Sequence, residues 1–177
     1  LMSSRGCPFH CNFCSVTAMF GRKFRAMSPE RVLAEVERAR RPGIFFYDDN
    51  LTAIRSRAHA ICDGLLGHAG RKVRWWSAQV RADVTKDEDL VAKMVRSGCI
   101  RVYVGFESIN PKALKEMHKG QSAEDVSQAI RRFHAHNLRV HGMFVYGADA
   151  DDADVLRSTS EFVRKHRVDS VQYMVLT

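Results

Sequence analysis

Three of the five cysteines in this 177-residue sequence lie within one short segment, at Cys7, Cys11 and Cys14. Their spacing is C-x3-C-x2-C, and no fourth cysteine follows nearby. A structural zinc ion needs four ligands, and His10 could supply the fourth beside the three thiolates. A cluster of four irons on three thiolates would instead leave one iron without a protein ligand, open to a substrate or cofactor. The segment therefore predicts a metal site of one of these two kinds.

The two remaining cysteines, Cys62 and Cys99, stand where their segments need small apolar residues, and we interpret both as buried and structural. An odd and sparse set of cysteines fits poorly with a disulfide framework and indicates a reducing compartment. No stretch approaches the roughly 18 consecutive apolar residues of a membrane helix. We therefore expect a cytoplasmic protein without membrane contact.

The net charge is +8, from 28 Lys and Arg against 20 Asp and Glu. This balance permits a polyanionic partner such as RNA. However, many of the basic residues are spread along predicted helices, which favours a solvated outer face over a nucleic-acid patch.

Strands and helices that could position the cysteines alternate along the rest of the chain. Short apolar runs predict strands at residues 44–47, 73–79, 100–106, 138–146 and 168–176. Residues 1–5 fit the end of a first strand, which would make six. Such a βαβ rhythm is typical of a parallel sheet, and the length suits a six-unit barrel better than the eight-unit barrel of about 250 residues. The predicted fold class is thus α/β, an open, partial (βα)6 TIM-like barrel with outer helices; a doubly wound sheet is the alternative.

Helix starts are marked by capping residues. Ser28 followed by Pro29 predicts one start, and Ser122 predicts another. Thr85 and Glu88 have the spacing of a capping box and predict a third.

The cysteine segment SRGCPFHCNFC, within this strand rhythm, resembles the cluster loop of the radical S-adenosylmethionine (radical SAM) superfamily, whose core is a six-unit partial barrel. The resemblance implies a 4Fe–4S cluster on Cys7, Cys11 and Cys14, with S-adenosylmethionine chelating the fourth iron. It also implies that one electron from the cluster cleaves S-adenosylmethionine, and that the 5′-deoxyadenosyl radical takes a hydrogen atom from an unknown substrate. Because the chain starts within a predicted strand and ends on one, we expect residues 1–177 to be the radical SAM core domain of a longer polypeptide whose flanking domains are absent.

Two strand ends resemble the superfamily's cofactor contacts. Tyr47, Asp48 and Asp49 occupy the place where the family carries Gly-Gly-Glu, which contacts the methionine amino group; the alternative is that the two aspartates cap the following turn. Glu107 and Ser108 follow the predicted strand at residues 100–106 and resemble the family's G-x-E-S pattern. In the family, the Glu and Ser of this pattern contact the ribose and the methionine part of the cofactor.

Two further side chains are candidates for cofactor binding. His141 lies in a segment, VHGMFVYG, that resembles the family's fifth strand, which packs against the adenine; a hydrogen-bonded interior histidine is the alternative. Arg81, at the end of the third strand, could meet a carboxylate of cofactor or substrate. A surface salt bridge is the alternative for this arginine.

The segments SVTAMFGRKFRAM, FFYDDNLTA and LKEMHKGQS look most like the cobalamin-associated and methylthiotransferase-like branch. That resemblance implies an oxidoreductase or transferase, an electron donor such as flavodoxin or ferredoxin, and cobalamin held by an N-terminal domain outside this segment. A tRNA methylthiotransferase core and a non-enzymatic, zinc-stabilised binding module remain as alternatives. The substrate, small molecule or macromolecule, is not readable from these residues.

Overall fold

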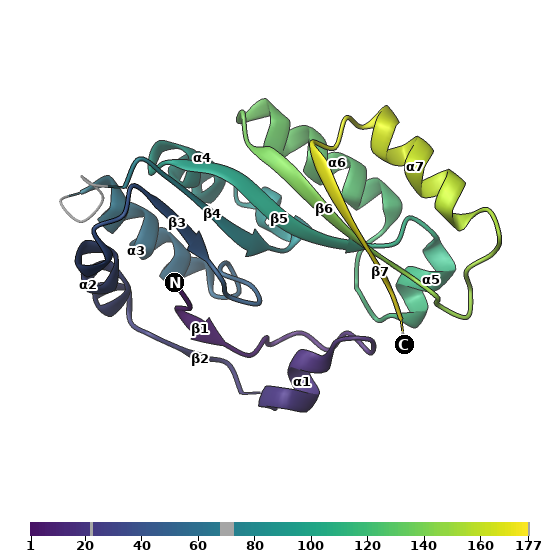
Figure 1. Ribbon diagram of the computed structural model, residues 1–177, viewed down its shortest axis with the longest axis horizontal. Helices are drawn as coiled ribbons and strands as arrows, with labels where there is room; N and C mark the ends of the chain where they lie inside the picture. The colour runs from purple at the N-terminus through teal and green to yellow at the C-terminus, as the bar shows by residue number, and fades with distance from the viewer. Residues whose placement is uncertain (22, 68–72, 177) are drawn as a thin grey trace.

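A five-stranded parallel sheet forms the centre of the molecule, which is a computed structural model that describes residues 1–21, 23–67 and 73–176 (Figure 1). The strands are β3 (Gly43–Phe46), β4 (Trp75–Val80), β5 (Cys99–Glu107), β6 (Arg139–Tyr146) and β7 (Ser170–Val175). Their order in the sheet follows their order in the chain without reversal. This is the winding of a barrel, whereas a doubly wound sheet reverses its order at a switch point. The predicted α/β partial barrel is confirmed.

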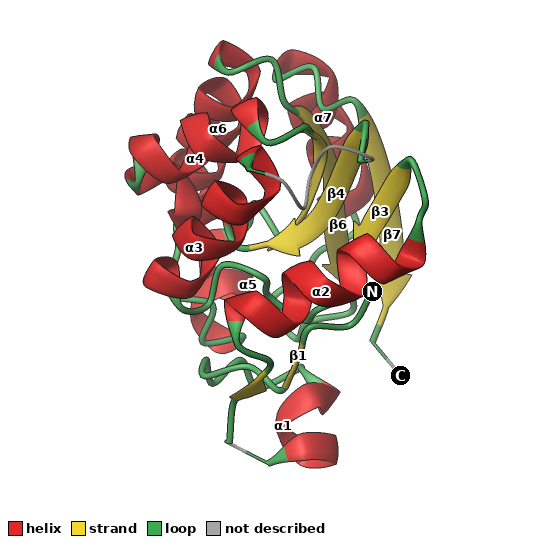
Figure 2. Cartoon of the chain, turned by 90° about the vertical axis from the view of Figure 1, so that its left-hand side faces the viewer, coloured by secondary structure: helices red, strands yellow, loops and turns green. Residues whose placement is uncertain are grey.

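Helices connect the strands and cover one face of the sheet. They are α2 (Pro29–Ala39), α3 (Arg55–Leu66), α4 (Glu88–Arg96), α6 (Ala123–Ala135) and α7 (Val155–Lys165), with the short α5 (Pro111–Glu116) and the 3₁₀ turn η2 (Ala82–Lys86). The short α1 (Ser15–Phe20) belongs to the N-terminal segment and lies apart from the sheet (Figure 1). Figure 2 shows α3, α4 and α6 together on one side of the sheet. The described part of the chain holds no helix both long enough and apolar enough to span a bilayer.

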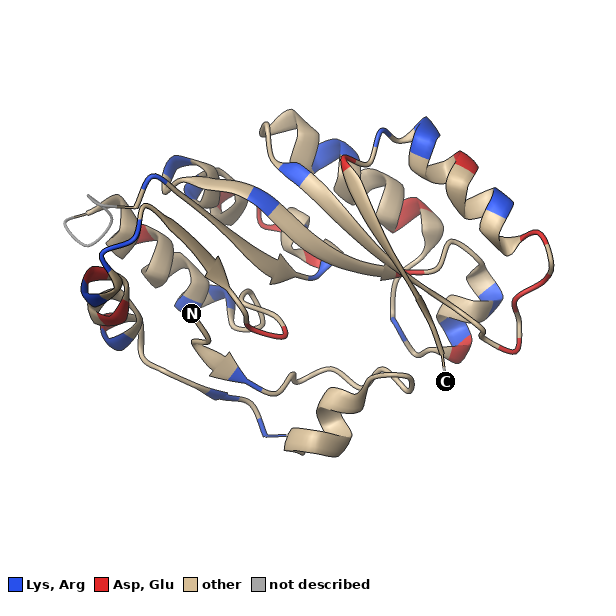
Figure 3. Cartoon of the chain, in the orientation of Figure 1, with Lys and Arg blue, Asp and Glu red and all other residues tan. Residues whose placement is uncertain are grey.

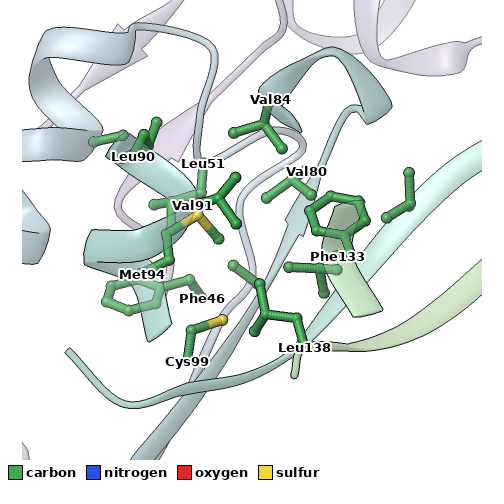
Figure 4. Close-up of a cluster of buried hydrophobic side chains, with 14 of the residues drawn as sticks. Phe46, Leu51, Val80, Val84, Leu90, Val91, Met94, Cys99, Phe133 and Leu138 are labelled. Atoms are coloured by element: carbon green, nitrogen blue, oxygen red, sulfur yellow. The ribbon is translucent and has the colours of Figure 1, made fainter. Parts of the chain in front are cut away.

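The core lies between this helical layer and the sheet (Figure 4). On β5, Val102, Val104 and Phe106 are fully buried at alternating positions, because successive strand side chains point to opposite faces. Cys62 and Cys99 are also in this core, as predicted. Burial raises the pKa of the Cys62 thiol to about 12 and that of Cys99 further still, so both stay protonated and unreactive.

Of residues 1–5, which the sequence predicts to be the end of a first parallel strand, only Leu1 pairs with the sheet. Leu1 lies along the edge of β3, where its N donates to Phe45 O (2.8 Å) and its carbonyl accepts from Tyr47 N (2.8 Å). The chain then leaves the sheet, and β1 (Ser4–Arg5) pairs antiparallel with β2 (Arg25–Ala26). Among the described residues the parallel sheet therefore has five strands, because the chain after Leu1 pairs with β2 and not with β3.

Two of the three predicted helix starts are confirmed. Ser28 caps α2 by accepting from Arg31 N, and Ser122 caps α6 in a reciprocal capping box with Asp125. The prediction for Thr85 is wrong. Its hydroxyl donates to Ala82 O inside η2, and Asp87 caps α4 by accepting from Leu90 N (3.0 Å). Asp87 lies directly before α4, so its carboxylate caps the helix in place of the Thr85 hydroxyl.

Candidate functional site

The three clustered cysteines line one cavity of about 170 Å³ near the carboxyl ends of the central strands. The cavity is lined by Cys7, Cys11, Phe13, Cys14, Val16, Asp49, Asn50, Gln79, Val80, Arg81, Gly105, Glu107, Lys119 and Met143. Residues far apart in the sequence meet here because parallel strands all end at the same edge of the sheet. The site thus brings together the three thiols and three of the predicted cofactor residues, Asp49, Arg81 and Glu107.

The thiols themselves are half-buried and influence one another. Burial raises the pKa of Cys7 and of Cys14, and the neighbouring Cys11 raises both further. Two cations act in the opposite direction: Arg81 lowers the pKa of Cys7, and Lys119 lowers that of Cys14. Three soft sulfur donors with two cations beside them form a donor set that suits an iron–sulfur cluster, whose thiolates carry negative charge.

Arg81 lines this site, and its Nε also lies 3.6 Å from Oδ1 of the partly exposed Asp83. Its Nη2 donates to Lys119 O (2.8 Å), and its Nη1 lies 3.8 Å from Cys11 Sγ. The guanidinium also covers the Phe9 ring at 3.9 Å from the ring centroid. Arg81 therefore joins β4 to the cysteine loop and holds a positive charge against the thiols.

Glu107 closes β5 and forms an ion pair with Lys119, with 2.7 Å between Oε1 and Nζ. Both side chains are only 7% exposed. The backbone of Glu107 has φ 63, directly after an irregularity in the pairing of β5 with β6. A Cβ on Gly105 would lie 2.3 Å from Glu107 Oε1, so glycine is needed there for the carboxylate to lie where it does. The sequence pattern did not single out Lys119, although a buried carboxylate requires a cationic or hydrogen-bonding partner.

Asn12 ties the cysteine loop to the end of α5, which the sequence did not reveal. Its backbone N donates to Met117 O (3.2 Å) and its Nδ2 donates to Glu116 O (3.1 Å). Its Oδ1 lies 2.8 Å from His118 Nδ1. These three contacts hold the cysteine loop against the end of α5 without a metal ligand taking part.

The two aspartates after β3 have different surroundings. Asp49 lines the cavity and accepts from Gly6 N (3.1 Å). Asp48 is fully buried and accepts from Ser3 N (3.2 Å), Ser3 Oγ (2.9 Å) and Ser4 Oγ. The prediction that Asp48 faces the cofactor is therefore wrong, because its oxygens hold the N-terminal segment against the sheet.

The other predicted residues lie outside the cavity lining. Tyr47 is 60% exposed beside β3, and the Ser108 hydroxyl accepts from Asn110 N (3.0 Å) at the turn after β5. His141 lies on the open face of the sheet, with Nδ1 2.8 Å from Ser170 Oγ. Burial lowers its pKa, so the ring is neutral near pH 7. The structure does not bring these side chains to the cysteines, and their cofactor contacts stay predictions.

A single zinc ion does not fit the described residues as well as a cluster does. Over residues 1–21, 23–67 and 73–176, no three His, Cys, Asp or Glu side chains lie close enough to share one metal ion. A tetrahedral zinc site needs four such groups around one ion. His10, the proposed fourth ligand, is exposed. In a 4Fe–4S cluster each thiolate binds a different iron, so three thiols spread around one cavity meet its requirement.

A partial barrel with three thiols at the carboxyl ends of its strands defines an iron–sulfur enzyme domain. The profile of the Radical SAM superfamily matches residues 1–160, and the chain belongs to this superfamily. Its cofactors are accordingly a 4Fe–4S cluster and S-adenosylmethionine, and Cys7, Cys11 and Cys14 stay the predicted ligands of the cluster.

Two curated relatives match the whole chain. The bacteriochlorophyllide d C-12(1)-methyltransferase of Chlorobaculum tepidum is 29% identical, and the chain covers 40% of its length. An uncharacterized methyltransferase of Pyrococcus horikoshii is 31% identical, and the chain covers 39% of it. Both relatives are therefore much longer than this chain.

A solved structure shares the fold. The radical S-adenosylmethionine methyltransferase TsrM of Kitasatospora setae, with cobalamin and a [4Fe-4S] cluster bound, superposes with a TM-score of 0.84. It is 15% identical, and the match covers 99% of this chain and 36% of TsrM. At this identity the likeness shows that the two chains share the fold.

Proposed function

We propose that this chain is the radical-forming core of a cobalamin-assisted methyltransferase with an unidentified substrate. The observation that carries the proposal is the convergence of Cys7, Cys11 and Cys14 with Glu107 and Lys119 on one cavity. When bound, the cluster supplies the electron that cleaves S-adenosylmethionine. The names of both curated relatives are those of methyltransferases, which supports group transfer over net oxidation of the substrate.

The chain's own residues have distinct roles in this proposal. Glu107 is placed to accept hydrogen bonds from cofactor hydroxyl or amino groups, since its carboxylate has a second oxygen beside the one paired with Lys119. Lys119 and Arg81 supply positive charge next to the thiols and next to the position of an anionic cofactor group. Asp49 also lines the cavity, and its carboxylate can accept hydrogen bonds from an amino group of the cofactor.

Cobalamin would be bound by a part of the longer protein outside residues 1–177. The support is TsrM, whose structure contains cobalamin together with the cluster. We also propose a cytoplasmic location and a one-electron donor protein as partner, because the cluster must be reduced to act. No described feature favours a tRNA substrate over others.

The test of this function is anaerobic reconstitution with iron and sulfide. We expect one 4Fe–4S cluster per chain, and we expect each of Cys7→Ala, Cys11→Ala and Cys14→Ala to lose it. Cys62→Ala is the matched control, since this thiol lies in the core and should leave the iron content unchanged. Full iron in Cys7→Ala together with loss of iron in Cys62→Ala would contradict the assignment.

A second measurement addresses S-adenosylmethionine. Glu107→Gln should weaken its binding to the reconstituted protein about tenfold or more, because a charge-assisted hydrogen bond contributes about 1.5–3 kcal/mol. Glu161→Gln, an exposed change on α7, should bind as the unchanged protein does. Equal affinities for all three proteins, measured by calorimetry, would remove Glu107 from the binding site.

A further inference from the structure

The segment that carries the cysteines has basic residues and no acidic ones. Residues 1–29 include Arg5, Arg22, Lys23 and Arg25 but no Asp or Glu, although the whole chain has 20 acidic residues. This segment forms β1, the cysteine loop, α1 and β2, which lie along the lower side of the molecule in Figure 3. The chain around the cluster ligands therefore has no negative charge of its own to offset these cations.

Two of these cations face each other across the small antiparallel ribbon. Arg5 of β1 is the register partner of Arg25 of β2, and both side chains are exposed. Neither forms an ion pair within the described residues, and the remaining positions, 22, 68–72 and 177, include no Asp or Glu. Like charges directly opposite each other on a sheet are destabilising. An unbalanced pair of this kind indicates that the opposite charge comes from a binding partner.

The ribbon also lines a cavity of about 380 Å³ with an apolar component. Met2 and Met27 line it beside Arg5 and Arg25, and the two methionines are 40% and 37% exposed. We call these four residues the ribbon patch. Exposed methionines surrounded by arginines are typical of a surface that binds another protein, with an apolar centre and a charged rim.

The ribbon is held firmly against the sheet. Arg57, which is nine-tenths buried, donates from Nη2 to Ser3 O (3.0 Å) and from Nε to Met27 O (2.9 Å). Asp48 accepts from the Ser3 and Ser4 hydroxyls. The ribbon patch is therefore a preformed surface, which lowers the entropic cost of binding a partner.

We propose that the ribbon patch is the docking surface for the acidic one-electron donor protein that reduces the cluster; this inference rests on the proposed function. Arg5 precedes Cys7 by two residues, so at most about 7 Å of extended chain separates their Cα atoms. A partner seated on the patch would bring its redox group close to a cluster ligand. The partner loses one electron and the cluster gains it, without bond breaking or proton transfer. Acidic side chains on the partner balance Arg5 and Arg25 and steer its approach.

The test compares two double variants that each remove two positive charges. Arg5→Gln with Arg25→Gln changes the patch, and Arg164→Gln with Lys165→Gln changes exposed residues at the end of α7 as the matched control. Each reconstituted protein is reduced anaerobically by flavodoxin hydroquinone or by dithionite, and the loss of visible cluster absorption is followed. We expect the patch variant to be reduced about tenfold more slowly by flavodoxin at low salt, at the lower end of electrostatic steering effects. Dithionite should reduce the patch variant at the same rate as the unchanged protein. The control variant should be reduced at the unchanged rate by both flavodoxin and dithionite.

Three results would overturn the proposal. One is an equal flavodoxin rate for the patch variant and the control. Another is a flavodoxin rate of the unchanged protein that does not fall with ionic strength, a measurement that needs no variant. The third is loss of tRNA binding by the patch variant with its flavodoxin rate intact, which would make the patch an RNA surface. A cluster that dithionite cannot reduce would instead contradict the proposed function, and the docking proposal with it.

Discussion

Glu107 and Lys119 form a buried ion pair in the lining of the cavity. A buried pair stabilises little compared with an apolar pair of similar size, but removing one partner leaves a buried charge without compensation. We therefore predict that Lys119→Met lowers the free energy of unfolding of the apoprotein by about 3–5 kcal/mol. Urea denaturation at neutral pH measures this change.

The double variant Lys119→Met with Glu107→Leu is the control for this prediction. Because it removes both charges, it should recover most of the lost stability, since the remaining apolar groups fill the same space. If the double variant is as unstable as Lys119→Met, the stability loss comes from packing and not from the uncompensated carboxylate.

Neighbouring aspartates give a second prediction at this scale. Asp48→Ala removes the acceptor of Ser3 and Ser4 and leaves the Arg57 guanidinium without its nearby carboxylate. We expect it to lower stability by about 3 kcal/mol or more, since it breaks a buried, charged hydrogen-bond network. Asp49→Ala, which loses one bond from Gly6 N at an exposed position, should change stability by less than about 1 kcal/mol. Thermal unfolding of the two variants distinguishes them, and equal losses would contradict the different surroundings.

At the residue scale, the cysteines, Arg81, Glu107 and Asp49, which the sequence assigned to one site, line the same cavity. The sequence did not identify Lys119 or Asn12 as site residues. Asn12 contacts Glu116, which is far away in the chain, and Lys119 pairs with Glu107 across the turn and helix that follow β5. Asp48 was misassigned because two adjacent carboxylates after a strand point in opposite directions, and the pattern does not say which one the cavity receives.

Helix α6 offers a prediction at the scale of an element. The Ser122 hydroxyl accepts from Asp125 N, and it also donates to the Asp125 carboxylate together with the Ser122 backbone amide. Ser122→Ala should therefore lower stability by about 1 kcal/mol at neutral pH. Ser160→Ala, whose hydroxyl bonds only to Leu156 O within α7, should stay within about 0.5 kcal/mol.

The effect of Ser122→Ala should depend on pH in a defined direction. Hydrogen bonds from Ser122 lower the pKa of Asp125 in the folded protein. A lowered folded pKa contributes stability above the unfolded value of about 3.9, and this contribution is lost as the pH falls through the folded pKa. The stability difference between the two proteins should thus shrink below about pH 4. A difference that grows under acid would contradict the role of the carboxylate.

At the scale of the whole molecule, the core and the cluster site are separate. None of Cys7, Cys11 or Cys14 belongs to the main buried cluster, whose residues come from the sheet and the helices. We therefore predict that the amides of β3 to β7 exchange with solvent at the same rate with and without the cluster. The amides of the cysteine loop should become more protected when iron and sulfide are added.

The variant Asn12→Ala refines this test. It removes the side-chain bond to Glu116 O and the contact with His118, so loop exchange should increase in the apoprotein while the strands stay unchanged. Equal loop protection in the apo and reconstituted forms would mean that packing and the Asn12 contacts hold the loop without the cluster.

The sequence by itself determined the strand rhythm and the superfamily. Apolar periodicity and helix caps act between residues close together in the chain, so the predicted strand at residues 44–47 corresponds to β3 and that at 100–106 to β5. The cysteine spacing is also local, and together with the strand rhythm it indicated the superfamily whose profile matches the chain.

The tertiary structure alone decided how distant loops meet. Arg81 reaches Lys119, Asn12 reaches α5, and β1 pairs with β2 and leaves the parallel sheet. Each of these contacts depends on where the ends of strands and helices converge in space, and periodicity along the chain carries no information about that. The opposed Arg5 and Arg25 became visible for the same reason, because only the register of the ribbon places the two charges face to face.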